Sequence, residues 1–268
     1  MFKLRTFEKR LLVGLLVFLL SISFSPLGVS KTIQHHRDIL YVGGDGPGNY
    51  STIGEAMINA TSGDTIFVFN GVYLEHVAIY KQVHLIGEDN TNTIIDGNGS
   101  GYVLSISDEM QHVVVSGFTI RNGDSGIYID TQVTNCTISN NIVVDNKDHG
   151  IYASGKVEYN IISDNIAARN HNGTSLGFAS YNEITGNTFE DNEEYGLTLI
   201  LWCNENEIHN NNFIGNKAPA FFFLSSLNNW FGNYWGRPRL LPKAIFGLMG
   251  ILPWINIDWR PRLTPYTS

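Results

Sequence analysis

The stretch Ile138-Ser-Asn-Asn141-Ile-Val-Val-Asp-Asn146 returns 24 residues later as Ile162-Ser-Asp-Asn165-Ile-Ala-Ala-Arg-Asn170. An apolar residue leads each copy, and the same pattern continues in both directions in steps of 22 or 24 residues. The apolar position is held by Val114, Ile138, Ile162, Ile184, Ile208 and Trp230. A short, regular repeat of this kind indicates a solenoid, in which each repeat buries its apolar side chains on the next.

Two columns of asparagine keep step with the apolar column. The first column holds Gly117, Asn141, Asn165, Asn187, Asn211 and Asn233, and the second holds Asn122, Asn146, Asn170, Asn192 and Asn216. Asparagine tolerates the left-handed backbone of a sharp corner, and its amide bonds to the amides above and below. We therefore interpret both columns as structural ladders at the corners of stacked coils.

The runs between the asparagines are short and β-prone, which excludes amphipathic helices of ten or more residues. We predict an all-β fold, a single right-handed parallel β-helix. A second inward pair is expected in each coil, at Ile127/Ile129, Ile151/Ala153, Leu197/Leu199 and Phe221/Phe223. Ser175 and Gly177 break that rule, so we expect a β-bulge within residues 171–180.

Both ends of the repeat array differ from its middle. Residues 1–30 have a basic start and an apolar run, which predicts a cleaved signal peptide; an uncleaved anchor at residues 11–29 is the alternative. Residues 31–110 are expected to form the N-terminal cap and first coils, residues 111–236 the regular repeats and residues 237–268 the C-terminal cap. Thr52-x-x-Glu55 is a capping-box signature that predicts a short helix over the open core.

The C-terminal segment is expected to close the other end of the core through the apolar run 244–252. This run is too short to span a bilayer. Contact with a membrane interface is the alternative, because Trp254, Trp259 and the arginines near them suit it.

Net charge restricts the class of partner, and the cysteine positions restrict disulfide pairing. The formal net charge is −8, and removing residues 1–30 leaves 13 basic and 24 acidic residues, or −11. An acidic surface repels phosphate backbones, so we expect no nucleic-acid partner. Cys136 and Cys203 fall about three coils apart, roughly 14 Å, too far for a disulfide. We expect an extracytoplasmic monomer, either secreted or anchored at the cell surface.

The Asn-x-Ile and Asn-Asn columns, with Gly-Ile-Tyr between them, resemble the NosD-like family of β-helix repeat proteins. The tail Asn-Tyr-Trp-Gly-Arg-Pro-Arg at residues 233–239 looks like the C-terminal signature of archaeal surface members. The resemblance implies an extracytoplasmic β-helix, often grouped with carbohydrate-binding and sugar-cleaving proteins, whose namesake is a copper-related accessory protein. Residues 42–97 are similar to the opening of pectin methylesterases, but the esterase and polygalacturonase catalytic motifs are absent.

A ridge of carboxylates and imidazoles is the candidate ligand site. Two positions after the second Asn column come Asp124, Asp148, Asn172, Glu194 and Ala218, flanked by His149, His171 and Glu193. Four residues further, an outward column reads Tyr128, Tyr152, Leu176, Thr198 and Phe222. Carboxylates hydrogen-bond sugar hydroxyls, and an aromatic ring stacks on a pyranose face. We therefore expect Tyr128 and Tyr152 to form a stacking platform, with Asp124 and Asp148 as acceptors.

Three functions stay open on this pattern. A non-catalytic module that binds polysaccharide or a glycosylated partner is favoured, because the known catalytic motifs are missing. The first alternative is a polysaccharide lyase or hydrolase, with Asp124, Asp148 and Glu194 as weak catalytic candidates. The second is a NosD-type structural or copper-related accessory protein. We expect no cofactor: calcium suits clustered carboxylates, whereas the histidines and methionines form no copper-ligand cluster, His35-His36 being the one adjacent pair.

Overall fold

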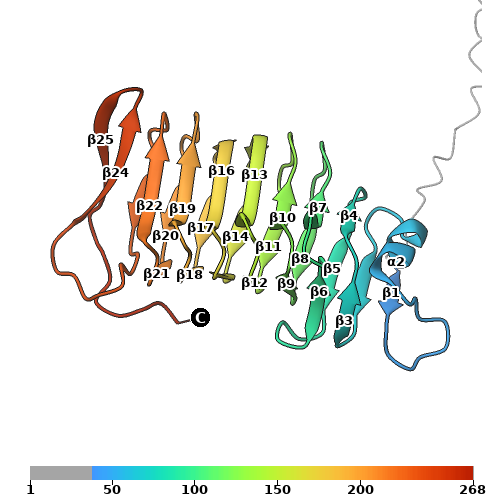
Figure 1. Ribbon diagram of the computed structural model, residues 1–268. Coiled ribbons are helices and arrows are strands. Elements are labelled where there is room, and N and C mark those ends of the chain that lie inside the picture. Colours follow the sequence, from blue (N-terminus) through green and yellow to red (C-terminus); the bar gives the residue numbers. More distant parts are fainter. Residues whose placement is uncertain (1–37, 268) are drawn as a thin grey trace, which may run out of the picture. The chain divides into compact units, whose positions relative to one another are not determined.

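A computed structural model describes residues 38–267, and in this range the strands stack like rungs from one end of the molecule to the other (Figure 1). The strands belong to three sheets, and apart from a terminal hairpin their pairings in residues 38–267 are parallel. The prediction of an all-β parallel β-helix is confirmed. The predicted signal segment, residues 1–30, and His35-His36 lie outside the described residues.

Each regular coil contributes one strand to each sheet. Sheet A contains, in order, β1 (Ile39–Val42), β2 (Thr65–Val68), β5 (His84–Gly87), β8 (Val114–Ser116), β11 (Thr137–Ser139), β14 (Ile161–Ser163), β17 (Glu183–Thr185), β20 (Glu207–His209) and β23 (Asn229–Phe231). Sheet B contains β3 (Gly71–Leu74), β6 (Thr93–Asp96), β9 (Thr119–Arg121), β12 (Ile142–Val144), β15 (Ile166–Ala168), β18 (Thr188–Glu190) and β21 (Asn212–Ile214). Sheet C contains β4 (Val77–Ile79), β7 (Tyr102–Ile106), β10 (Ser125–Ile129), β13 (His149–Glu158), β16 (Asn172–Ser180), β19 (Tyr195–Ile200), β22 (Ala218–Phe223), β24 (Lys243–Met249) and β25 (Leu252–Asp258).

The apolar column of sheet A fills one side of the core. Ile138, Ile162, Ile184, Ile208 and Trp230 pair in register and are buried. The prediction of Val114 as the first member is wrong, because Val115 pairs with Ile138 and is fully buried. The step from Val115 to Ile138 is 23 residues, one fewer than the 24 predicted for this coil.

The first ladder consists of Asn141, Asn165, Asn187, Asn211 and Asn233. In each step one Oδ1 accepts the backbone N–H and the side-chain amide of the Asn one coil earlier; for Asn165 the two distances from Asn141 are 3.0 and 3.1 Å. Gly117 is not a member, because Phe118 takes the corresponding place and donates its N–H to Asn141. The corners thus pair backbone groups that the bends would leave without partners.

The second ladder consists of Asn146, Asn170, Asn192 and Asn216. The prediction that Asn122 belongs to it is wrong: Gly123 donates its N–H to Asn146, and the exposed Asn122 turns its amide to Asp96. Asn122 instead has a φ of 58°, a left-handed conformation that asparagine tolerates.

A third ladder was not predicted. It consists of Asn160, Asn182, Asn206 and Asn228 at the remaining corner. Cys136 precedes it, donating its N–H to Asn160 and accepting the N–H of Val113 on Sγ at 3.4 Å. Cys203 likewise accepts a backbone N–H, from Ala179, and both thiols are free and buried. The cysteines therefore serve as corner acceptors as well as core fillers.

Sheet C differs from the prediction in the inward pairs of two coils and in the position of its irregularity. Thr174 and Leu176 pair with Ile151 and Ala153 and point inward, in place of Ser175 and Gly177. The irregularity lies in β13, between Ser154 and Val157, and not in residues 171–180. The inward pair of β22 is Ala220 and Phe222 and not Phe221 and Phe223, since Phe222 is fully buried.

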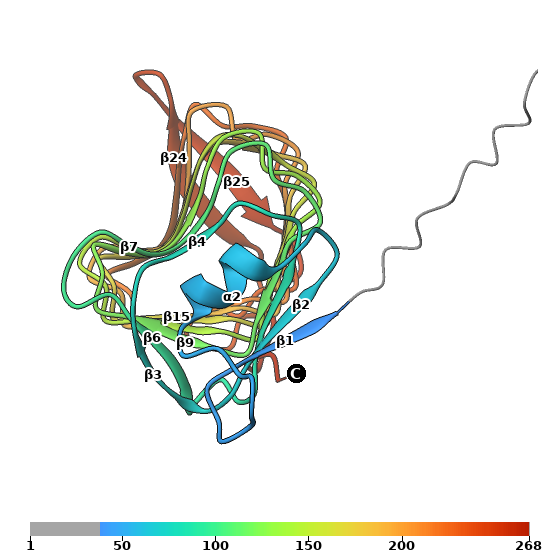
Figure 2. The same ribbon diagram turned by 90° about the vertical axis from the view of Figure 1, so that its right-hand side faces the viewer.

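The predicted helix covers the open N-terminal end of the core. Helix α2 (Ile53–Asn59) lies across the coil opening in the view along the axis (Figure 2). Its N-cap Thr52 accepts the N–H of Glu55 at 3.1 Å, and Ile53, Ala56 and Met57 are buried. Glu75 accepts the first helical N–H groups of Ile53 and Gly54 as well. This anion at the helix start complements the dipole.

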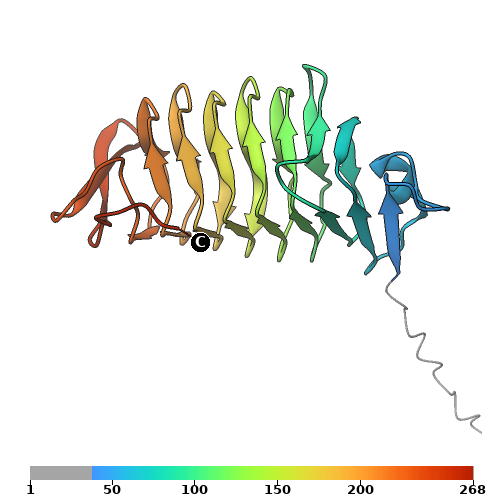
Figure 3. The ribbon, with the colours of Figure 1, turned by 90° about the horizontal axis from the view of Figure 1, so that it is seen from below.

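The C-terminal end consists of a strand hairpin and the segment that follows it. Strands β24 and β25 form an antiparallel hairpin that extends sheet C beyond β22 (Figure 3). Within the run 244–252, Ile245 is buried in the core, whereas Phe246, Ile251 and Leu252 are exposed. The last coil is also bonded to residues 258–266, through Gly232 to Arg260 and Arg262 to Asn233. Within residues 38–267 no helix is long and apolar enough to span a membrane.

Candidate ligand-binding face

The candidate face lies on sheet C, where β7, β10 and β13 are neighbours. Ile127 and Ile129 pair with Ile151 and Ala153 and are buried, so the alternation of side chains places the intervening Tyr128 and Tyr152 on the outer surface. Both tyrosines therefore point outward, as predicted.

Four aromatic side chains form a row across this face, which we call the ring row: Tyr102, Tyr128, Tyr152 and His149. Ring centroids are 4.3 Å apart for Tyr102 and Tyr128, 5.5 Å for Tyr128 and Tyr152 and 4.9 Å for Tyr152 and His149. The Tyr102–Tyr128 rings are nearly parallel, at 16°. Tyr128 thus lies between two other tyrosines and supports them on both sides.

The row does not continue along the molecule. Tyr152 is followed by Ser175, Thr198 and Phe221 in the outward column, and not by Leu176, Thr198 and Phe222 as predicted. Thr198 donates its hydroxyl to Ser175 at 2.8 Å. The candidate aromatic surface is therefore confined to three coils.

A hollow of about 340 Å³ opens beside the ring row. Its lining consists of Gly101, Tyr102, Asp124, Ser125, Asp148, His149 and Tyr152. This volume lies at the lower end of the range of about 300–1,000 Å³ for small-molecule sites. The hollow brings together four of the predicted residues, Asp124, Asp148, His149 and Tyr152, whereas Tyr128 does not line it.

Asp124 is held as an anion at the edge of the hollow. Its Oδ2 accepts the N–H of Gly101 at 2.8 Å, and its Oδ1 pairs with Lys147 at 3.2 Å. These two partners hold the pKa of the Asp124 carboxyl below its usual value. An acidic catalyst needs the opposite shift. Asp124 is therefore suited to accepting hydrogen bonds and unsuited to donating a proton.

His149 and Tyr128 are kept in their neutral forms. Burial lowers the pKa of His149, against the opposing charge of Asp148 and with the help of His171. Burial also raises the pKa of Tyr128 to about 12, together with the charge and hydrogen bond of Asp130. At neutral pH the ring row is thus uncharged, with carboxylates along its border.

The remainder of the predicted ridge lies apart from the hollow. Backbone bonding aligns Asp124, Asp148, His171, Glu194 and Lys217 in one column. Asn172 and Ala218, which were predicted in this column, belong to the neighbouring one with Ser125 and His149. His171 lies 3.3 Å from Glu193 and 3.8 Å from Glu194, which also pairs with Lys217 at 3.3 Å. Glu193 and Glu194 therefore have their partners within the ridge itself.

Tyr102 and Ser125 are site residues that the sequence reasoning missed. Tyr102-Val-Leu-Ser-Ile106 alternates like Ser125-Gly-Ile-Tyr-Ile129, and the two strands pair in register. Counting one repeat of 23 residues back from Ser125 would have found Tyr102. A second exposed stack, Tyr159 on Tyr181 at 5.2 Å, was also missed, because it lies at a turn outside the counted columns.

Residues 38–267 contain no group of three or more His, Cys, Asp or Glu side chains that could hold a metal ion. The free thiols, the usual soft copper ligands, are buried and already accept backbone N–H groups. The described residues thus provide no ligand set that fits copper.

Comparison with known proteins gives a family and a fold. The profile of the family described as periplasmic copper-binding protein (NosD) matches residues 57–240. The structure is similar to the alginate lyase of Paenibacillus sp. str. FPU-7, at 14% identity and a TM-score of 0.50, covering 74% of this chain and 76% of that one. Pectin methylesterase PemA from Erwinia chrysanthemi gives 12% identity and a TM-score of 0.44, covering 84% and 93%. No curated protein matches the sequence.

Proposed function

The chain belongs to the NosD family of β-helix proteins, and on this premise we propose that it is an exported protein that binds polysaccharide at the ring row. The family's description as periplasmic is in keeping with an extracytoplasmic location. The observation that carries the proposal is the hollow, where Tyr102, Tyr152 and His149 meet Asp124 and Asp148.

The chemistry of the hollow favours sugars. Tyr102 is 43% exposed and held by Tyr128 at its back, so it offers a rigid ring to an apolar pyranose face. The carboxylate oxygens of Asp124 and Asp148 accept hydroxyl protons from the ring's edge. Pre-organised rings reduce the entropy lost on binding.

The charge of the hollow restricts the class of sugar. Asp124 keeps its charge, and the exposed Asp148 lies on the next coil. A polyuronate would bring carboxylates against both of them. We therefore propose neutral glycans as ligands, whereas acidic chains are disfavoured. The lowered pKa of Asp124 argues against this residue as a general acid, whereas a base or a nucleophile would be ionised in the same way.

An oligosaccharide panel tests the proposal directly. The purified protein is screened on immobilised neutral and uronate glycans, and hits are titrated in solution. We expect binding to a neutral glycan with no release of reducing ends or unsaturated products on prolonged incubation. Retention of uronates alone, or of no glycan at all, would contradict the proposal. Release of products would favour a polysaccharide lyase or hydrolase.

A further inference from the structure

Charge is unevenly distributed along this protein. Residues 38–236 contain six basic and 23 acidic residues, a formal charge of −17. Residues 237–268 contain five basic residues and one acidic residue, a formal charge of +4. The single carboxylate of this C-terminal segment, Asp258, is fully buried and accepts from Asn233 and Trp235. The accessible side-chain charge of the segment is therefore entirely positive.

Large apolar side chains are exposed on the same segment. The β24–β25 hairpin presents Phe246, Ile251 and Trp254, which are 67%, 94% and 56% exposed. Ile251 lies in the connection between the two strands. Exposing these apolar side chains to water costs free energy unless another apolar phase covers them.

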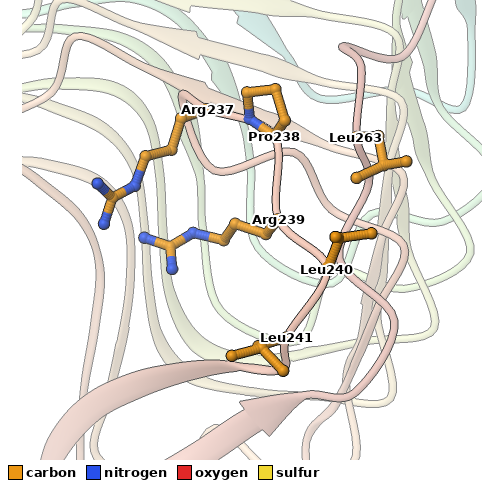
Figure 4. A pocket seen from close by; sticks show the side chains of 6 residues that line it. All are labelled: Arg237, Pro238, Arg239, Leu240, Leu241 and Leu263. Carbon is orange, nitrogen blue, oxygen red and sulfur yellow. The ribbon is translucent and has the colours of Figure 1, made fainter.

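A hollow with two kinds of lining lies beside the hairpin. It has a volume of about 640 Å³ and is lined by Arg237, Arg239, Leu240, Leu241, Leu263 and Pro238. The two arginine side chains extend toward the same side, while Leu240 and Leu263 lie on the other (Figure 4). Nε of Arg239 is buried and has no hydrogen-bond partner within residues 38–267. Two guanidinium groups beside leucines match a phosphate joined to an acyl chain.

We propose that residues 237–263 dock the end of the β-helix on an anionic phospholipid surface, with Arg237 and Arg239 on the headgroup phosphates and the hairpin tip in the acyl boundary. Aromatic and aliphatic side chains next to arginines are the composition of interfacial membrane contacts. This proposal does not depend on sugar binding. The ring row lies on β7, β10 and β13, whereas the hairpin lies at the end of sheet C.

Charge complementarity distinguishes lipid from a second copy of the chain. Two such ends placed face to face would bring two segments of +4 together, with no exposed carboxylate in either to offset them. An anionic bilayer instead offers the opposite sign over its whole area. The acidic coils point away from the membrane when the molecule binds by its end.

A site-specific probe tests the insertion. Cys136 and Cys203 are buried, so Ile251→Cys provides one exposed thiol for an environment-sensitive fluorophore. A matched protein carries the label at Leu74→Cys, which is 72% exposed on β3 near the other end. We expect a blue shift at position 251, and none at 74, on vesicles that contain phosphatidylglycerol. Neutral phosphatidylcholine vesicles should give little response, and raised salt should reverse it.

Charge variants complete the experiment. Each basic residue near an anionic surface strengthens binding about fivefold, so Arg237→Gln with Arg239→Gln should weaken vesicle binding about 30-fold. Lys156→Gln, on the exposed side of β13, is the control and should change it less than about twofold. Equal response on neutral and anionic vesicles would overturn the proposal. So would a blue shift at position 251 that follows protein concentration without lipid, which would indicate end-to-end dimers.

Discussion

Asp258 ends the first ladder by taking the place of an asparagine beneath Asn233. Its Oδ2 accepts the backbone N–H of Asn233 at 3.0 Å and the Asn233 side-chain amide at 3.2 Å. The same oxygen accepts the indole N–H of Trp235 at 3.0 Å. A carboxylate without hydrogens of its own is well suited to the last step, because no further acceptor follows below it.

Replacing Asp258 with alanine should therefore destabilise the C-terminal end strongly. Three buried donors would lose their acceptor, and we expect a loss of about 3–5 kcal/mol in the free energy of unfolding. Asp258→Asn, which restores an amide oxygen, should cost only about 1–2 kcal/mol. Denaturant titration measures both. A loss below about 1 kcal/mol for Asp258→Ala would show that the ladder does not depend on its final acceptor.

A central asparagine should be much more sensitive than one outside the ladders. Oδ1 of Asn187 accepts both amide groups of Asn165, and Nδ2 of Asn187 donates to Ile162 at 2.8 Å. Asn187→Ala leaves these buried groups unpaired and should cost about 2–4 kcal/mol. Asn122→Gly is the control, because Asn122 is exposed and glycine tolerates its φ of 58°; we expect less than about 1 kcal/mol. Equal losses in the two variants would be inconsistent with the ladder assignment.

The ring row should control glycan affinity without controlling stability. Tyr102→Ala with Tyr152→Ala removes both tyrosines that line the hollow, and affinity for the neutral glycan found in the screen should fall at least about tenfold. Tyr128→Ala should have a smaller effect, since Tyr128 packs between the two lining tyrosines and does not itself line the hollow. Isothermal titration gives the affinities, and thermal melting gives the stability.

Tyr159→Ala with Tyr181→Ala is the matched control for this experiment. It removes another stacked tyrosine pair, with centroids 5.2 Å apart, on an exposed turn. Glycan affinity should stay within about twofold of the unaltered protein. If the control loses affinity and the ring-row variant keeps it, the binding face has been assigned to the wrong side of the molecule.

Mild acid should destabilise the protein through His149. Burial lowers the pKa of this imidazole in the folded state, so the unfolded state binds the proton more readily. The stability from neutral His149 is fully present above the unfolded pKa of about 6.5 and is lost as the pH falls from that value through the lower folded pKa. The melting temperature should therefore decline between about pH 7.5 and pH 5, and less steeply in His149→Asn. Parallel slopes for the two proteins would count against a buried neutral imidazole.

The sequence by itself determined the coil. A period of 22–24 residues, with Asn and Ile in step, leaves a stack of parallel strands as the way to bury the apolar column and pair the corner amides. Thr52 and Glu55 likewise determined the capping helix, because a capping box depends on neighbours along the chain.

Tertiary structure alone decided the register and the site. A slip of one residue moves a β side chain to the opposite face, so the counts that misplaced Val114, Asn122 and Leu176 changed which groups face solvent. Tyr102 joins the ring row through pairing between coils, and its spacing of 23 residues from Ser125 differs from the steps of 22 or 24 in the regular repeats. The same holds for the hairpin at the C-terminal end. Whether its apolar side chains are buried depends on which other segments of the chain pack beside them.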